Sequence, residues 1–99
     1  MSSSKQFKDY IIEQLCVLPN ITYKSMMGEY LLYYNGILFG GIYDNRLLVK
    51  KTNSNKQYLL KENVPYKNAK PMYLIENVED TELLKEIIIN TFNDLVKKQ

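Results

Sequence analysis

The sequence predicts an α+β fold, an antiparallel sheet of about five strands with helices on one face. Two observations lead to this prediction: apolar residues recur at helical spacing near both ends of the chain, and short hairpin-linked strands lie between them. The 99 residues, 45% hydrophobic and 24% charged, have the usual size and composition of one globular domain. We therefore expect a single domain spanning residues 1–99.

The N-terminal segment predicts a helix that begins at a capping box formed by Ser3 and Gln6. Its apolar residues fall on one face at helical spacing: Phe7, Ile11, Leu15 and Leu18. Pro19-Asn20 ends the segment, because proline cannot continue a helix. Cys16 lies near the edge of the apolar stripe, which predicts a half-buried structural thiol.

The middle of the chain predicts a β-meander. Two-residue turns are expected at Asn35-Gly36, the strongest short hairpin signal, and at Asp44-Asn45. The strands are rich in apolar, β-branched and aromatic residues and are expected at 21–27, 30–34, 37–43 and 46–51.

The C-terminal half predicts a short helix at 57–62 and a last strand at 70–75. Pro71 places that strand, or at least its start, at an edge of the sheet, because proline cannot donate to a ladder. A final helix capped by Asp80 follows. Its apolar arc is wider than one packing layer needs, so we expect another element to cover the excess.

Alternation sorts the meander into two faces if both hairpin turns have two residues. The face predicted to meet the helices is apolar throughout: Leu31, Tyr33, Leu38, Gly40, Ile42, Leu47 and Val49. The opposite face is apolar and aromatic with cations at one side, which is typical of an interaction site. We therefore predict a protein-interaction face at Tyr30, Leu32, Tyr34, Phe39, Tyr43 and Leu48. The alternatives are that the final helix covers this face, or that a β-bulge at Gly40 or Gly41 exchanges the faces beyond it.

Basic residues are concentrated in one part of the chain, although the net charge is only +2. From Arg46 to Lys70 there are seven bases and one acid, Glu62. The predicted basic patch is Arg46, Lys50, Lys51, Lys56 and Lys61. Such a patch attracts phosphates or an acidic protein surface, and the plainer interpretation is a solvated loop region. We expect any nucleic-acid binding to be weak and non-specific, because the pI of about 8.6 is below that of a strongly basic binding domain.

Residue types that carry catalysis are scarce. The chain has no histidine and one cysteine, so it lacks the commonest general base and cannot build a structural zinc site. Its glycines do not have a phosphate-loop spacing. We therefore expect no catalytic residue, no metal and no cofactor. The lack of a long apolar segment and the single cysteine predict a cytoplasmic protein without membrane contact.

A run of short motifs occupies the middle of the chain and continues downstream. These are Lys24, Met26-Met27-Gly28, Leu32-Tyr33, Asn35-Gly36, Phe39 and Leu47–Lys50, followed by Pro65-Tyr66 and Pro71-Met72-Tyr73. In this order they resemble the N-terminal domain of the TfoX/Sxy family of competence regulators. The sequence departs from the family pattern at Lys24, Met27 and Glu29, where arginine, phenylalanine and glycine are usual. Full-length members also continue into a second, helical domain, whereas this sequence stops at Gln99.

The resemblance implies a two-layer α/β sandwich similar to secretion chaperones. It also implies a role in regulating DNA-uptake genes through contact with a transcription factor such as the cyclic-AMP receptor protein. It carries no catalytic residues. The predicted function is therefore a non-catalytic protein-interaction module, acting as a homodimer or bound to a protein partner. The alternative is a weak nucleic-acid-binding accessory protein that uses the basic region from Lys50 to Lys61.

Overall fold

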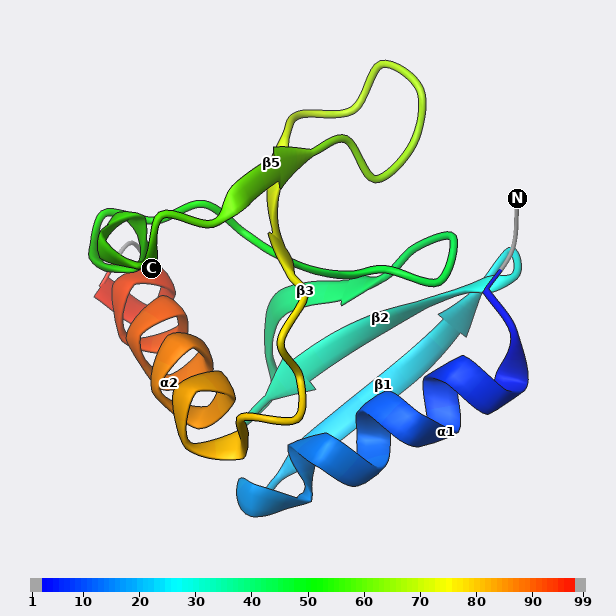
Figure 1. The fold of residues 1–99 in the computed structure, drawn as a ribbon, viewed down its shortest axis with the longest axis horizontal. Coiled ribbons are helices and arrows are strands. Elements are labelled where there is room, and N and C mark those ends of the chain that lie inside the picture. The colour runs from blue at the N-terminus through cyan, green and yellow to red at the C-terminus, as the bar shows by residue number, and fades with distance from the viewer. Residues whose placement is uncertain (1–2, 98–99) are drawn as a thin grey trace.

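A computed structural model describes residues 3–97 and confirms the predicted α+β fold (Figure 1). The two residues at each end of the predicted domain 1–99 lie outside the described residues. In chain order the elements are α1 (Lys5–Gln14), the 3-10 turn η1 (Leu15–Val17), β1 (Ile21–Met26), β2 (Glu29–Tyr34), β3 (Ile37–Ile42), β4 (Leu47–Val49), the 3-10 turn η2 (Ser54–Tyr58), β5 (Lys61–Asn63), β6 (Met72–Ile75) and α2 (Thr81–Lys97).

The six strands form one antiparallel sheet in the order β1-β2-β3-β4-β6-β5. The additional strand is β5, which begins within the segment 57–62 that was predicted as a short helix. The helical turn comes earlier and stops at Leu59, which adopts a left-handed conformation with a φ of 54° and turns the chain toward β5. The prediction of an edge position for 70–75 was also wrong. Pro71 comes one residue before β6, so its missing N–H does not interrupt the internal strand.

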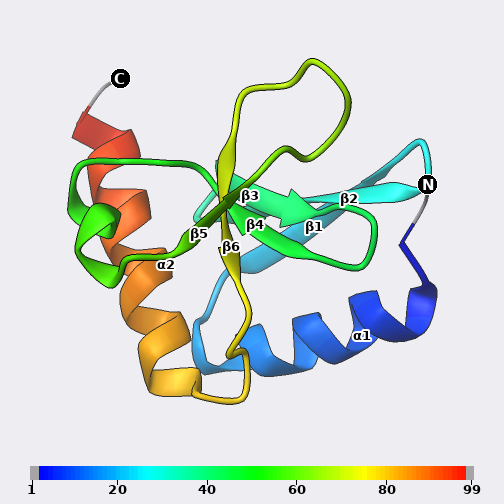
Figure 2. The same ribbon diagram turned by 45° about the horizontal axis from the view of Figure 1, so that its top comes forward.

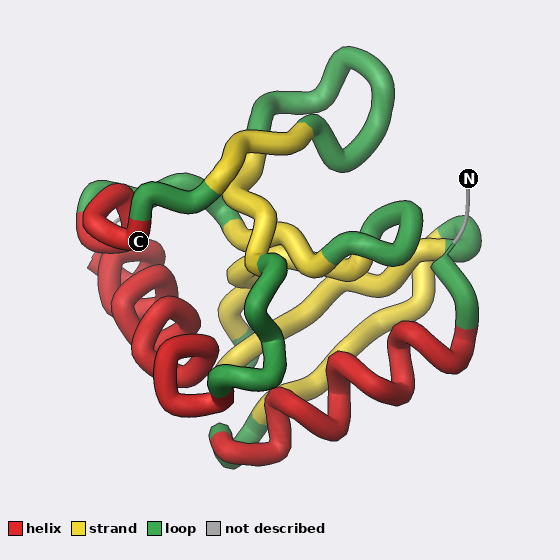
Figure 3. Tube along the Cα trace, in the orientation of Figure 1, coloured by secondary structure: helices red, strands yellow, loops and turns green. Residues whose placement is uncertain are grey.

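Both helices pack on the same face of the sheet and share one core. Ile11 and Leu15 come from the N-terminal segment, and Leu84, Ile87 and Ile88 come from α2. Figure 2 shows α1 along one side of the sheet and the loop between β5 and β6 rising from the other side. The wide apolar arc of α2 is explained, because α2 also contacts η1 and η2 (Figure 3).

The N-terminal cap is shifted by one residue from its predicted place. The Ser4 hydroxyl, and not that of Ser3, accepts the Phe7 N–H at 3.0 Å. Ser3 instead donates both its N–H and its hydroxyl to Glu29 Oε1, at 2.9 and 2.8 Å. The Asp44 N–H also donates to the Glu29 carboxylate. Glu29 therefore ties the start of the chain to the turn between β3 and β4.

Both predicted hairpin turns are confirmed, since all four of their residues have positive φ. The register is different from the prediction. Tyr33 pairs with Leu38, but Leu32 pairs with Gly40, so Phe39 is an extra residue in a β-bulge of β3. The bulge directly precedes the two glycines and reverses the facing of β2 and of the start of β3 relative to the prediction.

The predicted interaction face is therefore corrected. Leu32 and Phe39 are 0% exposed and belong to the core beneath the helices, and Tyr30 and Tyr34 pack against that core. Tyr43 and Leu48 are also buried but lie outside this core cluster, on the opposite side of the sheet. The half-buried residues Leu31, Tyr33 and Leu38, which were expected under the helices, lie on the side that the helices do not cover.

Candidate binding groove

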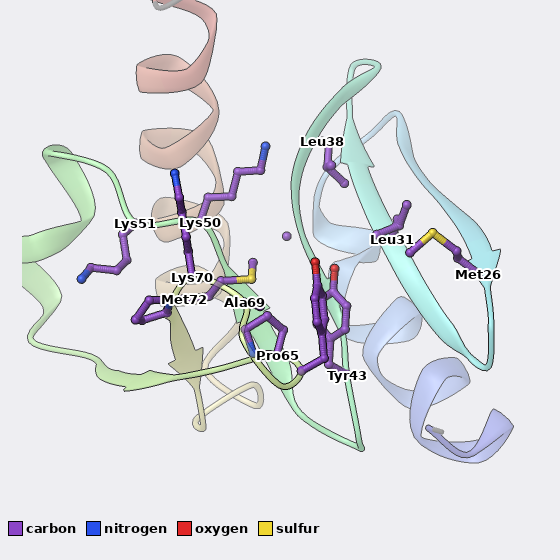
Figure 4. Close-up of a pocket in the computed structure, with 13 residues that line it drawn as sticks. Met26, Leu31, Leu38, Tyr43, Lys50, Lys51, Pro65, Ala69, Lys70 and Met72 are labelled. Carbon is purple, nitrogen blue, oxygen red and sulfur yellow. The ribbon is translucent and has the colours of Figure 1, made fainter. Parts of the chain in front are cut away.

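A half-open groove of about 830 Å³ lies on the side of the sheet away from the helices (Figure 4). One wall is aliphatic and consists of Met26, Leu31 and Leu38, one residue from each of the first three strands. The loop that joins β5 to β6 forms the other wall together with lysine side chains. The remaining lining residues are Gly40, Tyr43, Lys50, Lys51, Pro65, Tyr66, Ala69, Lys70, Pro71 and Met72.

Two consecutive glycines in β3 shape the groove. A Cβ at Gly40 would collide with the Leu48 carbonyl, and a Cβ at Gly41 would lie 2.7 Å from both the Tyr30 carbonyl oxygen and the Tyr43 ring. Backbone atoms are in the way at both positions, so neither position accepts a side chain without movement of the sheet. The centre of β3 thus stays bare, and the Tyr43 ring lies close against the strand.

Arg46 holds the β5–β6 loop in place. Its guanidinium donates to the Asn63 side chain at 3.1 Å and to the carbonyls of Val64 and Pro65 at 3.2 and 3.3 Å. Its Nε also donates to the Tyr43 carbonyl at 3.1 Å. The planar donor array of arginine suits such a set of acceptors, and lysine could not reproduce it. The predicted patch residue Arg46 is thus an internal clamp, because its donors are used within the chain.

Two tyrosines meet at one end of the groove. The rings of Tyr43 and Tyr66 are 6.2 Å apart and tilted by 54°. Tyr43 is buried, whereas Tyr66 is 63% exposed at the tip of the loop. Burial raises the pKa of the Tyr43 phenol, and the neighbouring Tyr66 and Glu29 act in the same direction. Tyr43 therefore stays neutral at physiological pH, and the exposed Tyr66 ring is available for contact.

Three lysines and no acid line the groove. Lys51 is paired with Glu62 at 3.1 Å and lies over the Tyr73 ring, and in Figure 4 its side chain points away from the other two lysines. Lys50 and Lys70 have no ion pair within residues 3–97. The groove thus presents two uncompensated positive charges next to an apolar wall.

The predicted basic patch is not one continuous site. Lys50 and Lys51 line the groove. Arg46 is the loop clamp, and Lys61 lies 3.6 Å from Glu76. Lys56 is exposed on η2 and does not line the groove.

Sequence reasoning missed Tyr66, Lys70 and Met72 as parts of a site. Tyr66 and Met72 belong to the two proline-containing motifs, Pro65-Tyr66 and Pro71-Met72-Tyr73, and Lys70 directly precedes the second, so these motifs are the signal that could have found them. A loop that starts and ends at a proline is restricted in its backbone, which favours a fixed shape over a solvated one.

Residues 3–97 contain neither a cluster suited to a metal ion nor a helix suited to cross a membrane. No cluster of three or more His, Cys, Asp or Glu side chains that could hold a metal ion occurs there. Cys16 is exposed, which corrects the expectation of a half-buried thiol, and its Sγ lies 3.4 Å from the Ile12 carbonyl. None of the helices in this part of the chain is long and apolar enough to cross a membrane.

Comparison with known proteins agrees with the fold and with the resemblance seen in the sequence. The family described as the TfoX N-terminal domain matches residues 13–91. The chain belongs to this family. A similar protein is the "Uncharacterized 12.7 kDa protein in trpE 5'region" of Spirochaeta aurantia, 25% identical over 80 residues, which are 79% of this chain and 70% of the relative.

Several of the residues by which this TfoX N-terminal domain resembles its family line the groove. Met26, Lys50, Pro65-Tyr66 and Pro71-Met72 all belong to the motifs and to the lining. The departure at Glu29 also has a structural account, since its carboxylate accepts hydrogen bonds from Ser3 and from Asp44.

Proposed function

We propose that this TfoX N-terminal domain is a non-catalytic protein-binding module and that its partner docks in the groove. The observation that carries the proposal is the combination of an open apolar wall with a clamped loop opposite it. Exposed apolar surface rimmed by charge is typical of interaction sites. Because Arg46 fixes the loop, a partner would lose little free energy in ordering it.

The composition of the groove favours binding over catalysis. None of its lining residues is an acid, a histidine or a cysteine. Its lysines could serve as positive charges or as primary amines. Catalysis at this groove would have to rely on lysine or tyrosine without a carboxylate or histidine among the lining residues.

We further propose that the partner is a transcription factor, as for the TfoX/Sxy competence regulators that the sequence resembles, and that the chain acts in the cytoplasm on gene expression. A second copy of the chain is the alternative protein partner. The alternative class is weak, non-specific nucleic-acid binding, which the uncompensated Lys50 and Lys70 would favour. Phosphate contacts would make such binding fall steeply with salt.

Affinity purification from the native cell tests the proposal with a matched pair of variants. Leu38→Asp places a carboxylate on the apolar wall of the groove. Leu59→Asp is the control, because Leu59 is 90% exposed, does not line the groove and has a left-handed backbone that aspartate tolerates. We expect one protein to co-purify with the wild type and the control but not with Leu38→Asp. Equal recovery with all three, or recovery of nucleic acid alone, would overturn the proposal.

A further inference from the structure

We propose that the groove binds an acidic segment of its protein partner, anchored by one large apolar side chain. This inference rests on the proposed function and adds the chemistry of the partner. The groove offers two separate kinds of surface, an aliphatic wall and a wall that carries lysines. Between them lies the part of β3 at Gly40, which has no side chain. A ligand that fills the groove must therefore be apolar on one side and negative on the other.

The charge of the partner follows from the two lysines that lack an ion pair. Lys50 and Lys70 point in a common direction in Figure 4, and no carboxylate lines the groove near them. Their charges repel each other and attract an anion, and an adjacent apolar wall strengthens the attraction by lowering the local dielectric. Neither lysine has an ion pair within residues 3–97, so an acidic side chain of a partner could pair with either of them.

The size of the groove indicates what the anchor is. About 830 Å³ is in the range of sites that enclose a drug-sized ligand, and it exceeds the volume of any single side chain. It therefore accommodates several residues of a segment, including one phenylalanine or leucine. Leu31, Leu38 and Met72 line it, and the flexible methionine can adjust to the shape of the anchor.

A protein segment fits these observations better than a nucleic acid. Single-strand binding uses several exposed aromatic rings for base stacking. Of the two tyrosines that line the groove only Tyr66 is exposed, because Tyr43 is buried against β3. The guanidinium of Arg46, the usual phosphate fork, is already bonded to the loop.

Arg46 is a positioning residue in this scheme. It does not line the groove, but it fixes the loop that carries Tyr66 and Lys70. Arg46→Lys keeps the charge and removes the planar donor array. We expect this variant to loosen the loop and weaken binding even though the charge is unchanged.

The test is a titration of the isotope-labelled chain with three capped peptides, followed by two-dimensional nuclear magnetic resonance. The peptides contain Asp-Glu-Phe-Leu-Asp-Glu, its charge-reversed form Lys-Arg-Phe-Leu-Lys-Arg, and the anchor-free form Asp-Glu-Gly-Ser-Asp-Glu. We expect only the first to bind and to shift the amide signals of Leu38, Gly40, Lys50, Tyr66 and Met72. A short single-stranded oligonucleotide serves as a fourth probe.

The affinity for the first peptide is then measured with charge-reversal variants of the chain. We expect Lys50→Glu combined with Lys70→Glu to weaken the first peptide by about tenfold, since each exposed ion pair contributes a few-fold and its reversal adds repulsion. Lys85→Glu is the control, because Lys85 is exposed on α2 and does not line the groove, and it should change the affinity by less than about twofold. For Arg46→Lys we expect about threefold weaker binding and faster amide exchange at Ala69, whose N–H bonds to Tyr66 within the loop.

Several outcomes would contradict the acidic-segment inference, and they can be distinguished from a failure of the proposed function. Equal binding of the charge-reversed peptide, tighter binding of the oligonucleotide, or signal shifts away from the groove would overturn the inference. Self-association of the unliganded chain that Leu38→Asp abolishes would identify a second copy as the occupant and also overturn it. If no peptide binds while the co-purifying protein still depends on Leu38, the acidic-segment inference fails and the proposed function stands. If that dependence is also absent, both fail.

Discussion

The β-bulge at Phe39 predicts that Phe39 and its neighbour Leu38 contribute very differently to the stability of the fold. Phe39 is fully buried among the helices, whereas Leu38 is half-buried on the groove side. Replacing each by alanine should therefore have very different effects on stability. Leu38 and Phe39 are consecutive residues of β3, so the two variants form a matched pair.

The expected magnitudes follow from burial. Truncating a buried phenylalanine leaves a cavity and costs about 3–5 kcal/mol. Truncating a partly exposed leucine removes only part of its buried area and costs about 1 kcal/mol. In a domain of this size one kcal/mol corresponds to a shift in melting temperature of roughly 4–8 °C. Phe39→Ala should thus lower the melting temperature by on the order of 20 °C, and Leu38→Ala by about 5 °C.

Thermal unfolding followed by circular dichroism measures both variants. Aspartate makes the contrast stronger, because Phe39→Asp would bury an unpaired carboxylate and should abolish the fold. Leu38→Asp should remain folded and lose only partner binding. A larger loss of stability for the Leu38 variants than for the Phe39 variants would refute the observed register and place the groove wall in the core.

Three further predictions concern other parts of the chain. Cys16→Ser should change stability by less than about 0.5 kcal/mol and leave partner binding intact, because the thiol is exposed and does not line the groove. Loss of binding in the pull-down with an unchanged melting curve would contradict the placement of the binding site in the groove. Glu29→Gln should cost about 1–2 kcal/mol in chemical denaturation, since the hydrogen bonds from Ser3 and Asp44 would lose a charged acceptor. Glu13→Gln, at an exposed position on α1, is the control. Hydrogen bonds from the Ser54 N–H and hydroxyl lower the pKa of Asp94 below its ordinary 3.8. The stabilisation by Asp94 is therefore present above pH 3.8 and is lost as the pH falls through the lowered value. A melting series from pH 6 to pH 2 should show a smaller acid-induced loss for Asp94→Asn than for the wild type.

Local signals predicted most of the elements correctly. The N-terminal apolar stripe, the hairpin turn at Asn35-Gly36 and the helix cap at Asp80 all appear where the sequence placed them, and Leu83 donates to the Asp80 carboxylate at 3.1 Å. Each of these features depends on residues within one or two turns of chain. Local propensity and capping therefore suffice to predict them.

The groove could not be predicted from the same signals. A single extra residue at Phe39 exchanges the faces of β2 and of the start of β3, and alternation alone cannot say whether a strand contains a bulge. The lysines that line the groove and those that are paired elsewhere also look alike in the sequence. Only the folded chain shows that Arg46 and Lys61 have partners, whereas Lys50 and Lys70 have no ion pair within residues 3–97.

The sequence by itself determined the α+β class, the hairpins, both long helices and the family to which this domain belongs. The tertiary structure decided which face of the sheet is the core, where β5 lies and which residues border the groove. The physical reason is the range of the interactions. Turn and helix signals are satisfied between near neighbours in the chain, but the clamp of Arg46 on the β5–β6 loop joins residues 17 to 19 positions apart. Such contacts exist only once the sheet has brought the two segments together.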